Sequence, residues 1–337
     1  MEEKMARVTL KMLAEHTGLA VSTISEILNG KPNFCSTETR EYVLKTASEL
    51  GYTPNLGFKL MTGRDTGTAA ILYSQRRISF EEHNRALAMS LLEALDKLGR
   101  SAYTVVLSVD PKQNLQRIRE LISRGCREFF FLGAPMGDKE IYALLDGEKF
   151  SRSHFNSYGA THNSIQIDYS FVAASFIDYY LERGIRPCLL FTRRHFERYG
   201  QTELLRRNLS TEEHFIEVCD LGHLQKDCFM LAYERSRAAV ENGISRFAAP
   251  VGWICMTDCD AMGVLAALNR AHLPAVYNGS PLVCGFGNSS YSKLSVQPVN
   301  SVDLKLEYVV RGMLSPRDGC KIYRPDIIFN DKEVKHE

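Results

Sequence analysis

The chain has 337 residues, of which 45% are hydrophobic, with 41 Lys and Arg against 40 Asp and Glu. That length exceeds what one hydrophobic core usually serves, so two or three globular domains are expected. A formal net charge of +1 excludes a strongly basic protein but allows a local nucleic-acid site, so partners must be inferred from motifs.

The sequence carries no sign of a membrane anchor or of an oxidising compartment. No apolar run approaches the roughly 18 residues that span a bilayer, and MEEKMARVTLKM lacks the basic-then-apolar order of a signal peptide. Nine cysteines lie scattered without a CxxC pair, which favours neither a disulfide framework nor a zinc site. We therefore expect a cytoplasmic protein with mostly buried, reduced thiols, no cofactor and no metal.

Three short helices are predicted near the N-terminus, because apolar residues recur there at helical spacing. The three apolar faces are Leu10, Leu13 and Ala14, then Ile24, Ile27 and Leu28, then Val43, Leu44, Ala47 and Leu50. Thr9 is placed to cap the first helix and Ser36 the third, while Gly18 and Gly51 end them. The Gly- and Thr-rich segment TGRDTGT, residues 62–68, then predicts a linker.

From the linker onward, short apolar runs alternate with amphipathic helical stretches. The runs are TAAILYS, AYTVVLS, EFFFLG, SIQID, PCLLF, FIEV, WICMT and LVCGF, and the helices lie near 80–98, 112–124, 170–184, 197–209, 224–242 and 260–271. This alternation predicts an α/β fold with parallel sheets covered on both faces, and about 270 residues favour two such sheets. In such folds ligands bind beyond the carboxyl ends of the strands.

The stretch LAVSTISEILNGKPNFCSTETR, residues 19–40, places a second short helix directly after a glycine-containing turn. This is the helix-turn-helix arrangement, whose second helix enters the major groove of DNA. The side of that helix opposite Ile24 and Ile27 carries Val21, Ser22, Ser25, Glu26 and Asn29. Most of these are short enough for the backbone to approach phosphates and base edges. Periodicity alone leaves open a plain three-helix bundle with solvated serines.

Longer motifs distinguish a DNA-binding helix-turn-helix from a plain three-helix bundle. VTLKMLAEHTGLAVSTISEILNGKP, TRE at 39–41, LGYTPN at 50–55 and TGR at 62–64 closely resemble the LacI/GalR family of bacterial transcriptional repressors. Weaker matches extend the resemblance through IDYS at 167–170, TDCDAMGVLAAL at 257–268, CGFGN at 284–288 and QPVNSV at 297–302. The resemblance implies a DNA-binding domain, a hinge helix and a periplasmic-binding-protein-like core that binds a small effector between two subdomains.

The resemblance also implies a division of the chain. We expect a helix-turn-helix domain at residues 1–53, a hinge helix and linker at 54–67, and an effector-binding and dimerisation core at 68–337. Within the core, the N-subdomain is expected at about 68–166 and 292–322, and the C-subdomain at about 167–291 and 323–337. Both subdomains are expected to be doubly wound parallel sheets.

Carried over by position, the DNA-binding residues fall into three groups. Thr9, Thr23, Ser25 and Asn29 would contact phosphates, Val21, Ser22 and Glu26 would face bases, and Leu10 and Lys59 belong to the same surface. The hinge would be NLGFKLM, residues 55–61, which folds on the operator in the family. Met61 would insert there into the minor groove as an apolar wedge that kinks the duplex.

Several positions depart from the family pattern. Glu26 stands where Arg is common, so an acceptor that suits the cytosine amino group replaces a donor that reads guanine, and we expect an unusual operator. The alternative without base recognition is that Glu26 pairs with a neighbouring Lys or Arg. Ala20 replaces a common capping Ser, and Gly57 and Phe58 make hinge folding harder. Residues 1–64 hold eight basic and seven acidic residues, so nonspecific attraction to DNA should be weak.

The effector site is implied by position alone. Ser74, Arg198, Thr257 and Asn288 would line it, and Arg198 suits a bidentate bond to sugar hydroxyls or a carboxylate unless it is an ordinary surface arginine. Gly287 stands where many sugar-binding relatives carry an acid, which leaves the ligand class open. Asp258 and Asp260 allow a metal pair, but at a strand-to-helix junction one of them is expected to cap the helix instead.

The resulting hypothesis is a homodimeric transcription regulator, a repressor that binds operator DNA, and a small, sugar-like effector is expected to change its affinity for the operator. One alternative keeps DNA binding but gives the core only dimerisation or a protein partner. An enzyme is disfavoured because GxxxxGK[ST], GxGxxG, GxSxG and HExxH motifs are missing. A solute-binding protein would need a signal peptide and would not need residues 1–64.

Overall fold

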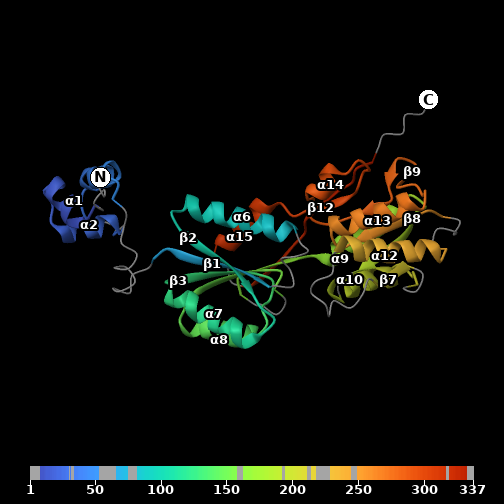
Figure 1. Ribbon diagram of the computed structural model, residues 1–337, viewed down its shortest axis with the longest axis horizontal. Coiled ribbons are helices and arrows are strands. Elements are labelled where there is room, and N and C mark those ends of the chain that lie inside the picture. The colour runs from blue at the N-terminus through green and yellow to red at the C-terminus, as the bar shows by residue number, and fades with distance from the viewer. Residues whose placement is uncertain are drawn as a thin grey trace, which may run out of the picture. The chain divides into compact units, whose positions relative to one another are not determined.

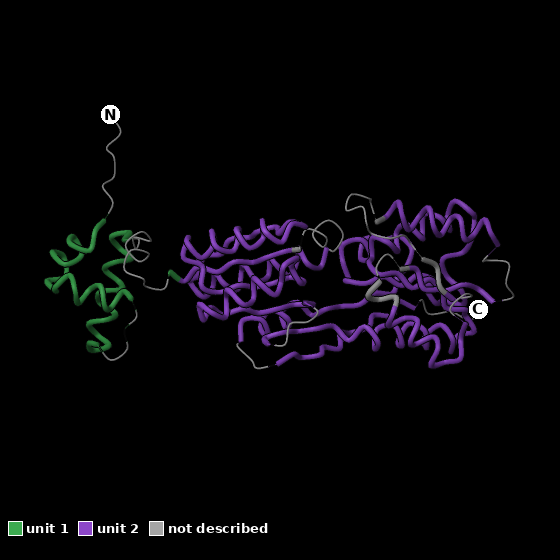
Figure 2. Tube along the Cα trace, turned by 90° about the horizontal axis from the view of Figure 1, so that it is seen from below, with its two compact units in different colours: residues 1–66 green, residues 67–337 purple. Residues whose placement is uncertain are grey.

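The computed structural model describes most of the chain as two compact units, residues 1–66 and 67–337 (Figure 2). The described residues are 8–29, 31, 34–52, 66–74, 82–157, 162–191, 194–210, 214–217, 228–243, 249–315 and 319–331. The hinge sequence 55–61, with Lys59 and Met61, lies outside them. No helix in the described ranges is long and apolar enough to cross a membrane.

The first unit contains three short helices, as the sequence predicts. They are α1 (Leu10–Thr17), α2 (Val21–Leu28) and α3 (Thr37–Glu49). Their core consists of Leu13, Ile24, Ile27, Val43 and Ala47, each at most 6% exposed. The prediction was wrong for Leu44, which is 47% exposed. One residue beyond Val43 turns the side chain by about 100°, and only the narrow stripe of α3 that faces α1 and α2 is buried.

The ends of these helices follow the expected capping chemistry. The Thr9 hydroxyl accepts from the Met12 N–H at 3.3 Å, and the Ser36 hydroxyl accepts from the Thr39 N–H at 3.2 Å. Gly18 ends α1 with φ of 71°, a conformation that a side chain would strain. Ala20 precedes α2 with extended backbone and no side-chain cap, so α2 begins with an unassisted N-terminus.

The second unit begins with a six-stranded parallel sheet of order β13-β5-β4-β3-β1-β2. Its strands are β1 (Thr68–Ser74), β2 (Ser101–Leu107), β3 (Cys126–Leu132), β4 (Ser151–Phe155), β5 (Ser164–Ile167) and β13 (Cys320–Tyr323). Its helices are α6 (Glu82–Lys97), α7 (Pro111–Ser123), α8 (Asp138–Gly147) and α15 (Leu306–Leu314). Helices α6 and α15 cover one face and α7 and α8 the other (Figure 1).

A second, four-stranded parallel sheet has the order β11-β8-β6-β7. Its strands are β6 (Arg186–Phe191), β7 (Phe215–Glu217), β8 (Val251–Cys255) and β11 (Val283–Cys284), and its helices are α9 (Tyr169–Leu181), α10 (Arg194–Arg206), α12 (Cys228–Glu241) and α13 (Asp258–Arg270). Side chains of α9 pack on one face and those of α12 and α13 on the other. Two parallel sheets with helices on both faces confirm the predicted fold class.

Several elements were missed by the sequence reading. They are α8, β4, β9 (Val276–Tyr277), β10 (Ser280–Pro281), α14 (Ser290–Leu294), β12 (Ser301–Asp303), α15, β13 and β14 (Asp326–Ile328). In β4, SRSHF, Phe155 alone is strongly apolar, so its burial leaves little trace in the sequence. Strand β13 pairs with β5, which lies more than 150 residues earlier, and β12 pairs antiparallel with β14. The chain therefore returns to the first sheet after building the second.

Candidate nucleic-acid interface and ligand site

Helix α2 has one buried and one accessible side. Ile24 and Ile27 are at most 1% exposed, because they pack between α1 and α3. On the opposite side Val21 is 43% exposed, Ser22 and Asn29 are exposed, and Ser25 and Glu26 are half-buried. The predicted recognition surface is therefore available to a partner.

The other residues assigned to DNA have local roles of their own. Thr9 is exposed while its hydroxyl caps α1, and Leu10 and Thr23 are half-buried, with Leu10 packed against the core of the first unit. The Asn29 side-chain amide donates to the Ser25 carbonyl at 2.5 Å and to its hydroxyl at 3.3 Å. Asn29 and Ser25 thus form one polar patch at the end of α2.

Glu26 is not isolated on this surface. Its Oε2 lies 3.5 Å from Nζ of Lys31, with the two side chains 32% and 53% exposed. This is the pairing with a neighbouring lysine that the sequence reading left open. The pair lies on the accessible side of α2, so pairing with Lys31 does not remove Glu26 from the recognition surface.

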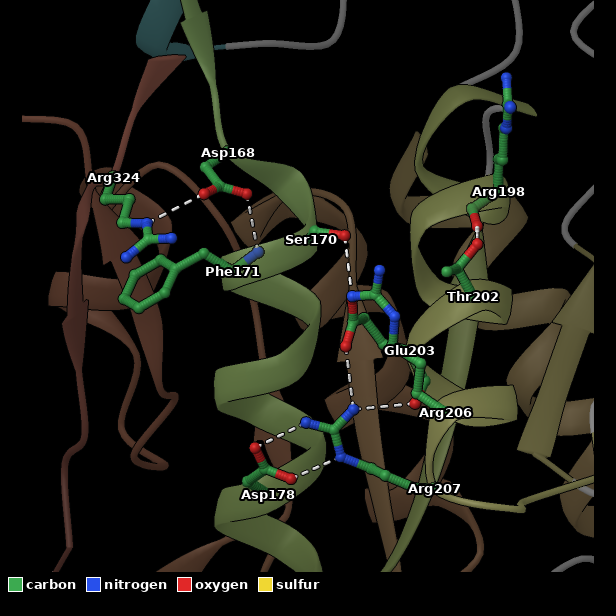
Figure 3. Close-up of polar contacts among 10 residues, drawn as sticks. All are labelled: Asp168, Ser170, Phe171, Asp178, Arg198, Thr202, Glu203, Arg206, Arg207 and Arg324. Atoms are coloured by element: carbon green, nitrogen blue, oxygen red, sulfur yellow. Dashed lines mark hydrogen bonds and ion pairs between the residues drawn. The ribbon is translucent and has the colours of Figure 1, made fainter.

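Arg198 lies in the first half of α10 and is exposed. Its carbonyl accepts from the Thr202 hydroxyl at 2.7 Å, but no hydrogen bond or ion pair joins its guanidinium to another described residue. Figure 3 shows this guanidinium directed away from Glu203 and Arg207. With respect to the described residues, the guanidinium donors of Arg198 are therefore available to a ligand.

The helix that carries Arg198 is bonded to α9 through the buried carboxylate of Glu203 and through an ion pair of Arg207 (Figure 3). Glu203, 4% exposed, accepts from the Ser170 hydroxyl at 2.9 Å and from Arg206 at 2.6 Å. The Arg207 guanidinium donates to the Glu203 carboxylate at 3.0 Å and to the Asp178 carboxylate through two hydrogen bonds of 2.5 and 2.7 Å. Two-pronged bonds of this kind fix orientation as well as distance. The C-terminal half of α10 is therefore held against α9.

Thr257 follows β8 and is 6% exposed. Its hydroxyl accepts from the Asp260 N–H at 3.0 Å and donates to the Asp260 carboxylate at 2.9 Å, so Thr257 is the N-cap of α13. The prediction that Asp258 or Asp260 caps this helix was wrong, because the preceding threonine takes that position. This hydroxyl is already bonded inside the protein, which limits what Thr257 can offer a ligand.

Asp258, 1% exposed, gathers donors from three later positions. Its Oδ2 accepts from the Ser289 N–H at 2.7 Å, the Ser289 hydroxyl at 2.8 Å and the Ser292 hydroxyl at 2.8 Å, while Oδ1 accepts from Ser301 at 2.6 Å. Gly285 makes room for this carboxylate, since a Cβ there would lie 2.3 Å from Oδ1. Asp258 is thus an organising residue that holds the segment after β11 in place.

The described residues contain no group of three or more metal-binding side chains. Burial raises the pKa of Cys126 to about 11 and the pKa values of Cys188 and Cys284 to about 12. These thiols are protonated at neutral pH and so are poor metal ligands and poor nucleophiles.

Asn288 has φ of 44° and follows Gly287, whose φ is 119°. The Asn288 N–H donates to the Ser301 hydroxyl at 3.0 Å, and its side-chain amide donates to Asp303 at 3.3 Å. A Cβ on Gly287 would lie 3.6 Å from the nearest atom, on His83, so there is space for a side chain. The backbone conformation, which L-residues rarely adopt, is what favours glycine here over an acid.

The sequence reading missed an aromatic cluster beside these residues. Phe286 meets His83 at 5.5 Å and Tyr169 at 5.8 Å between ring centroids, and Tyr169 meets Tyr199 at 6.0 Å. Asn156 at the end of β4 donates to the Tyr169 hydroxyl at 2.9 Å. Phe286 and Tyr169 stand inside CGFGN and IDYS, so their proximity to the implied effector residues could have been noticed.

The four residues assigned to the effector all lie at or after strand ends. Ser74 ends β1, Thr257 follows β8, Asn288 follows β11, and Arg198 is on the helix after β6. Arg198, Thr257 and Asn288 make no described contact with one another. The aromatic cluster is what joins elements of both sheets at this end of the strands, which is the end where α/β folds bind ligands.

Comparison with known proteins agrees with this geometry. Residues 9–55 match the family "Bacterial regulatory proteins, lacI family". The "HTH-type transcriptional regulator CelR" of Thermobifida fusca is 37% identical over 73 residues, which are 22% of this chain and 21% of that relative. The sequence match thus spans about a fifth of the relative's length.

Solved structures resemble the chain over nearly its whole length. The lac repressor dimer bound to operator and the anti-inducer ONPF has a TM-score of 0.71 at 16% identity, covering 97% of this chain and 99% of that one. A CelR–cellobiose complex has a TM-score of 0.61 at 17% identity, covering 97% and 100%. At such identities the likeness shows the fold. Residues 9–55 are thus similar to the LacI family of bacterial regulatory proteins, and the chain as a whole has the fold of the lac repressor.

Proposed function

We propose that the protein is a sequence-specific DNA-binding transcription regulator, a repressor, that binds operator DNA as a homodimer and responds to a small effector. The observation that carries the proposal is the accessible polar side of α2, set on a buried Ile24–Ile27 stripe within a LacI-family domain. A regulator of this kind acts on the chromosome, which places it in the cytoplasm.

The DNA-binding role follows from the chemistry of α2. Ser22 and Ser25 are short enough to let the helix backbone approach the groove, and Val21 offers an apolar contact to a thymine methyl group. Thr9, Leu10, Thr23, Asn29, Lys59 and Met61 complete the proposed DNA surface. We assign residues 1–53 to this domain, 54–67 to the hinge and linker, and 68–337 to the core.

A homodimer is supported by an exposed apolar surface on the first sheet. Strand β2 is the edge of that sheet, and its Tyr103 and Val106, which point to opposite faces, are 37% and 50% exposed. Met89 on the adjacent α6 is 57% exposed. An unprotected apolar edge of this kind invites association, and a second copy would pair two DNA-binding domains on a two-fold operator.

We place the effector between the two sheets, where Ser74, Arg198, Thr257 and Asn288 follow strand ends near the aromatic cluster. Aromatic faces and a guanidinium that no described residue bonds suit a polyhydroxylated ligand, and one structure of the same fold is a CelR–cellobiose complex. Gly287 has a backbone conformation that favours glycine and stands where many sugar-binding relatives carry an acid. The alternative therefore remains that the core serves only dimerisation or a protein partner.

DNA binding is tested by footprinting on genomic fragments with the full chain and two matched variants. Ser22→Glu adds a negative charge to the accessible side of α2, and Ser48→Glu adds the same charge to an exposed position of α3. We expect wild type and Ser48→Glu to protect one pseudo-palindromic site, and Ser22→Glu to lose at least tenfold in affinity. Binding that does not exceed binding to random competitor DNA would overturn the proposal.

Effector binding is tested by thermal shift with sugars, nucleosides and organic acids, because any ligand of the folded state raises apparent stability. Arg198→Met should abolish the shift caused by an active compound. Arg237→Met, which removes another arginine at a helix surface, should keep it. An unchanged shift in Arg198→Met would remove Arg198 from the site.

A further inference from the structure

Lys31 contacts three residues, Glu26 on α2, Arg40 on α3 and Phe34 between these helices, although its side chain is 53% exposed. Its N–H donates to the Glu26 carbonyl at 3.1 Å, and its own carbonyl accepts from Arg40 on α3. Its ammonium lies 3.5 Å from the Glu26 carboxylate and 5.0 Å from the centre of the Phe34 ring. A long lysine side chain is usually mobile, so this degree of fixation is unusual for a surface position.

The pairing is poorly explained as a stabilising contact. Exposed ion pairs contribute little to stability, and Lys45 with Glu49 on α3 shows what such a pair looks like, with 3.8 Å between charges and side chains 76% and 62% exposed. The pair of Lys31 and Glu26 differs because the Lys31 ammonium also lies over the Phe34 ring. They also lie on the accessible side of α2, where the partner is expected.

Lys31 reduces the electrostatic repulsion that the Glu26 carboxylate would experience near DNA phosphates. A carboxylate brought into the major groove is repelled by phosphates on both sides, and a neighbouring ammonium offsets that repulsion. Together the two side chains present an acceptor and a donor next to each other with no net charge. A C·G base pair presents the complementary arrangement, because the cytosine amino group and the guanine O6 are joined by a hydrogen bond and lie about 2.9 Å apart.

We propose that Glu26 and Lys31 act as one reading unit for a single C·G base pair in each half-site, the carboxylate accepting from cytosine and the ammonium donating to guanine. The 3.5 Å between their charged atoms is close to the roughly 2.9 Å that separates those two groups. Phe34 and Arg40 are positioning residues that hold Lys31 beside Glu26. This assignment rests on the proposed function and adds a specificity residue to it.

The experiment is selection of operators from a randomised DNA pool with the full-length wild type, Glu26→Ala, Lys31→Met, the double variant and Lys45→Met. We expect Glu26→Ala and Lys31→Met to relax the same position of each half-site, each by about tenfold, and the double variant to lose little more than either. Lys45→Met should enrich the wild-type operator unchanged. Thermal unfolding of each variant shows that the domain remains folded.

Two other outcomes would overturn the assignment. If Lys31→Met weakens binding to all sequences equally and lowers the salt dependence by about one counterion, Lys31 contacts a phosphate instead. If the two single variants relax different positions, they do not read one base pair. In both cases the wild type still selects an operator, whereas a wild type that enriches no sequence would show that the proposed function itself fails.

Discussion

The carboxylate of Asp258 accepts a hydrogen bond of 2.6 Å from the hydroxyl of Ser301, and both residues are 1% exposed. Ser301 in turn accepts from the Asn288 N–H at 3.0 Å. These two bonds connect the start of α13, the loop after β11 and strand β12. The proposed effector residue Asn288 is therefore positioned through Asp258, which does not itself need to meet the ligand.

Replacing Asp258 by Asn should destabilise the core by about 2–4 kcal/mol, because an amide has a single acceptor oxygen and would turn N–H groups toward buried donors. Urea unfolding of the full chain measures the change. Asp326→Asn is the matched control, since that side chain is 62% exposed, and it should change stability by less than about 0.5 kcal/mol. Equal effects of the two changes would mean that Asp258 has no special structural role.

Periodicity predicted α2 and β1 well because their burial is recorded directly in the sequence. Ile24 and Ile27 lie on one helical face, and AAIL in β1 is buried on both faces of a sheet. Strand β4 was missed because its buried residues include Ser153 and His154. His154 is fully buried by stacking on Phe131 at 5.1 Å, a partner more than 20 residues away, and local sequence cannot reveal such a contact.

The candidate sites show the same limit. Position in a known motif led to Arg198 and Asn288, but the donors that surround Asp258 come from residues 31 to 43 positions later. The Asp258 interaction is created where α14 and β12 fold back onto the start of α13. The pairing of Glu26 with Lys31, five residues apart, was foreseen as an alternative because it needs local geometry alone.

A second prediction concerns pH and His154. Burial, reinforced by the Arg152 guanidinium 3.0 Å from Nε2, lowers the pKa of His154 from its ordinary value of 6.5 to about 3. The folded protein therefore binds this proton less well than the unfolded chain, so its stabilising contribution is complete above pH 6.5 and is lost as pH falls toward 3. Between pH 7.5 and 5.5 the cost is about 1 kcal/mol.

His154→Phe removes this titration while keeping an aromatic ring against Phe131. Urea unfolding at the two pH values should show a decrease in stability that is smaller by about 1 kcal/mol in the variant than in wild type. His162→Phe, at an exposed position before β5, should behave as wild type. Carboxylates contribute equally to all three proteins, so identical pH dependence would mean that His154 also charges freely in the folded state.

A third prediction uses the two helix starts of the first unit. Ala20→Ser should supply the missing cap of α2 and stabilise the domain by about 1 kcal/mol, because the extended backbone at Ala20 already suits a capping residue. Thr9→Ala should remove the cap of α1 and destabilise it by a similar amount. Thermal unfolding of residues 1–66 should shift by about 4–8 °C in opposite directions. A decrease with Ala20→Ser would show that a side chain is not tolerated at that turn.

The last prediction concerns the edge of the first sheet. Val106 is 50% exposed on β2, and a charge placed there would be buried without a partner if a second copy packs on this strand. Val106→Asp should therefore raise the dissociation constant of the dimer at least a hundredfold, since an unpaired charge in an interface costs several kcal/mol.

Leu205→Asp is the matched control, because Leu205 is 62% exposed on α10, away from that strand. Sedimentation of the full chain at micromolar concentration should show a monomer for Val106→Asp and a dimer for wild type and Leu205→Asp. Because two adjacent half-sites need two linked domains, the monomer should also lose operator affinity although its α2 is unchanged. A dimeric Val106→Asp would place the contact between copies on another surface.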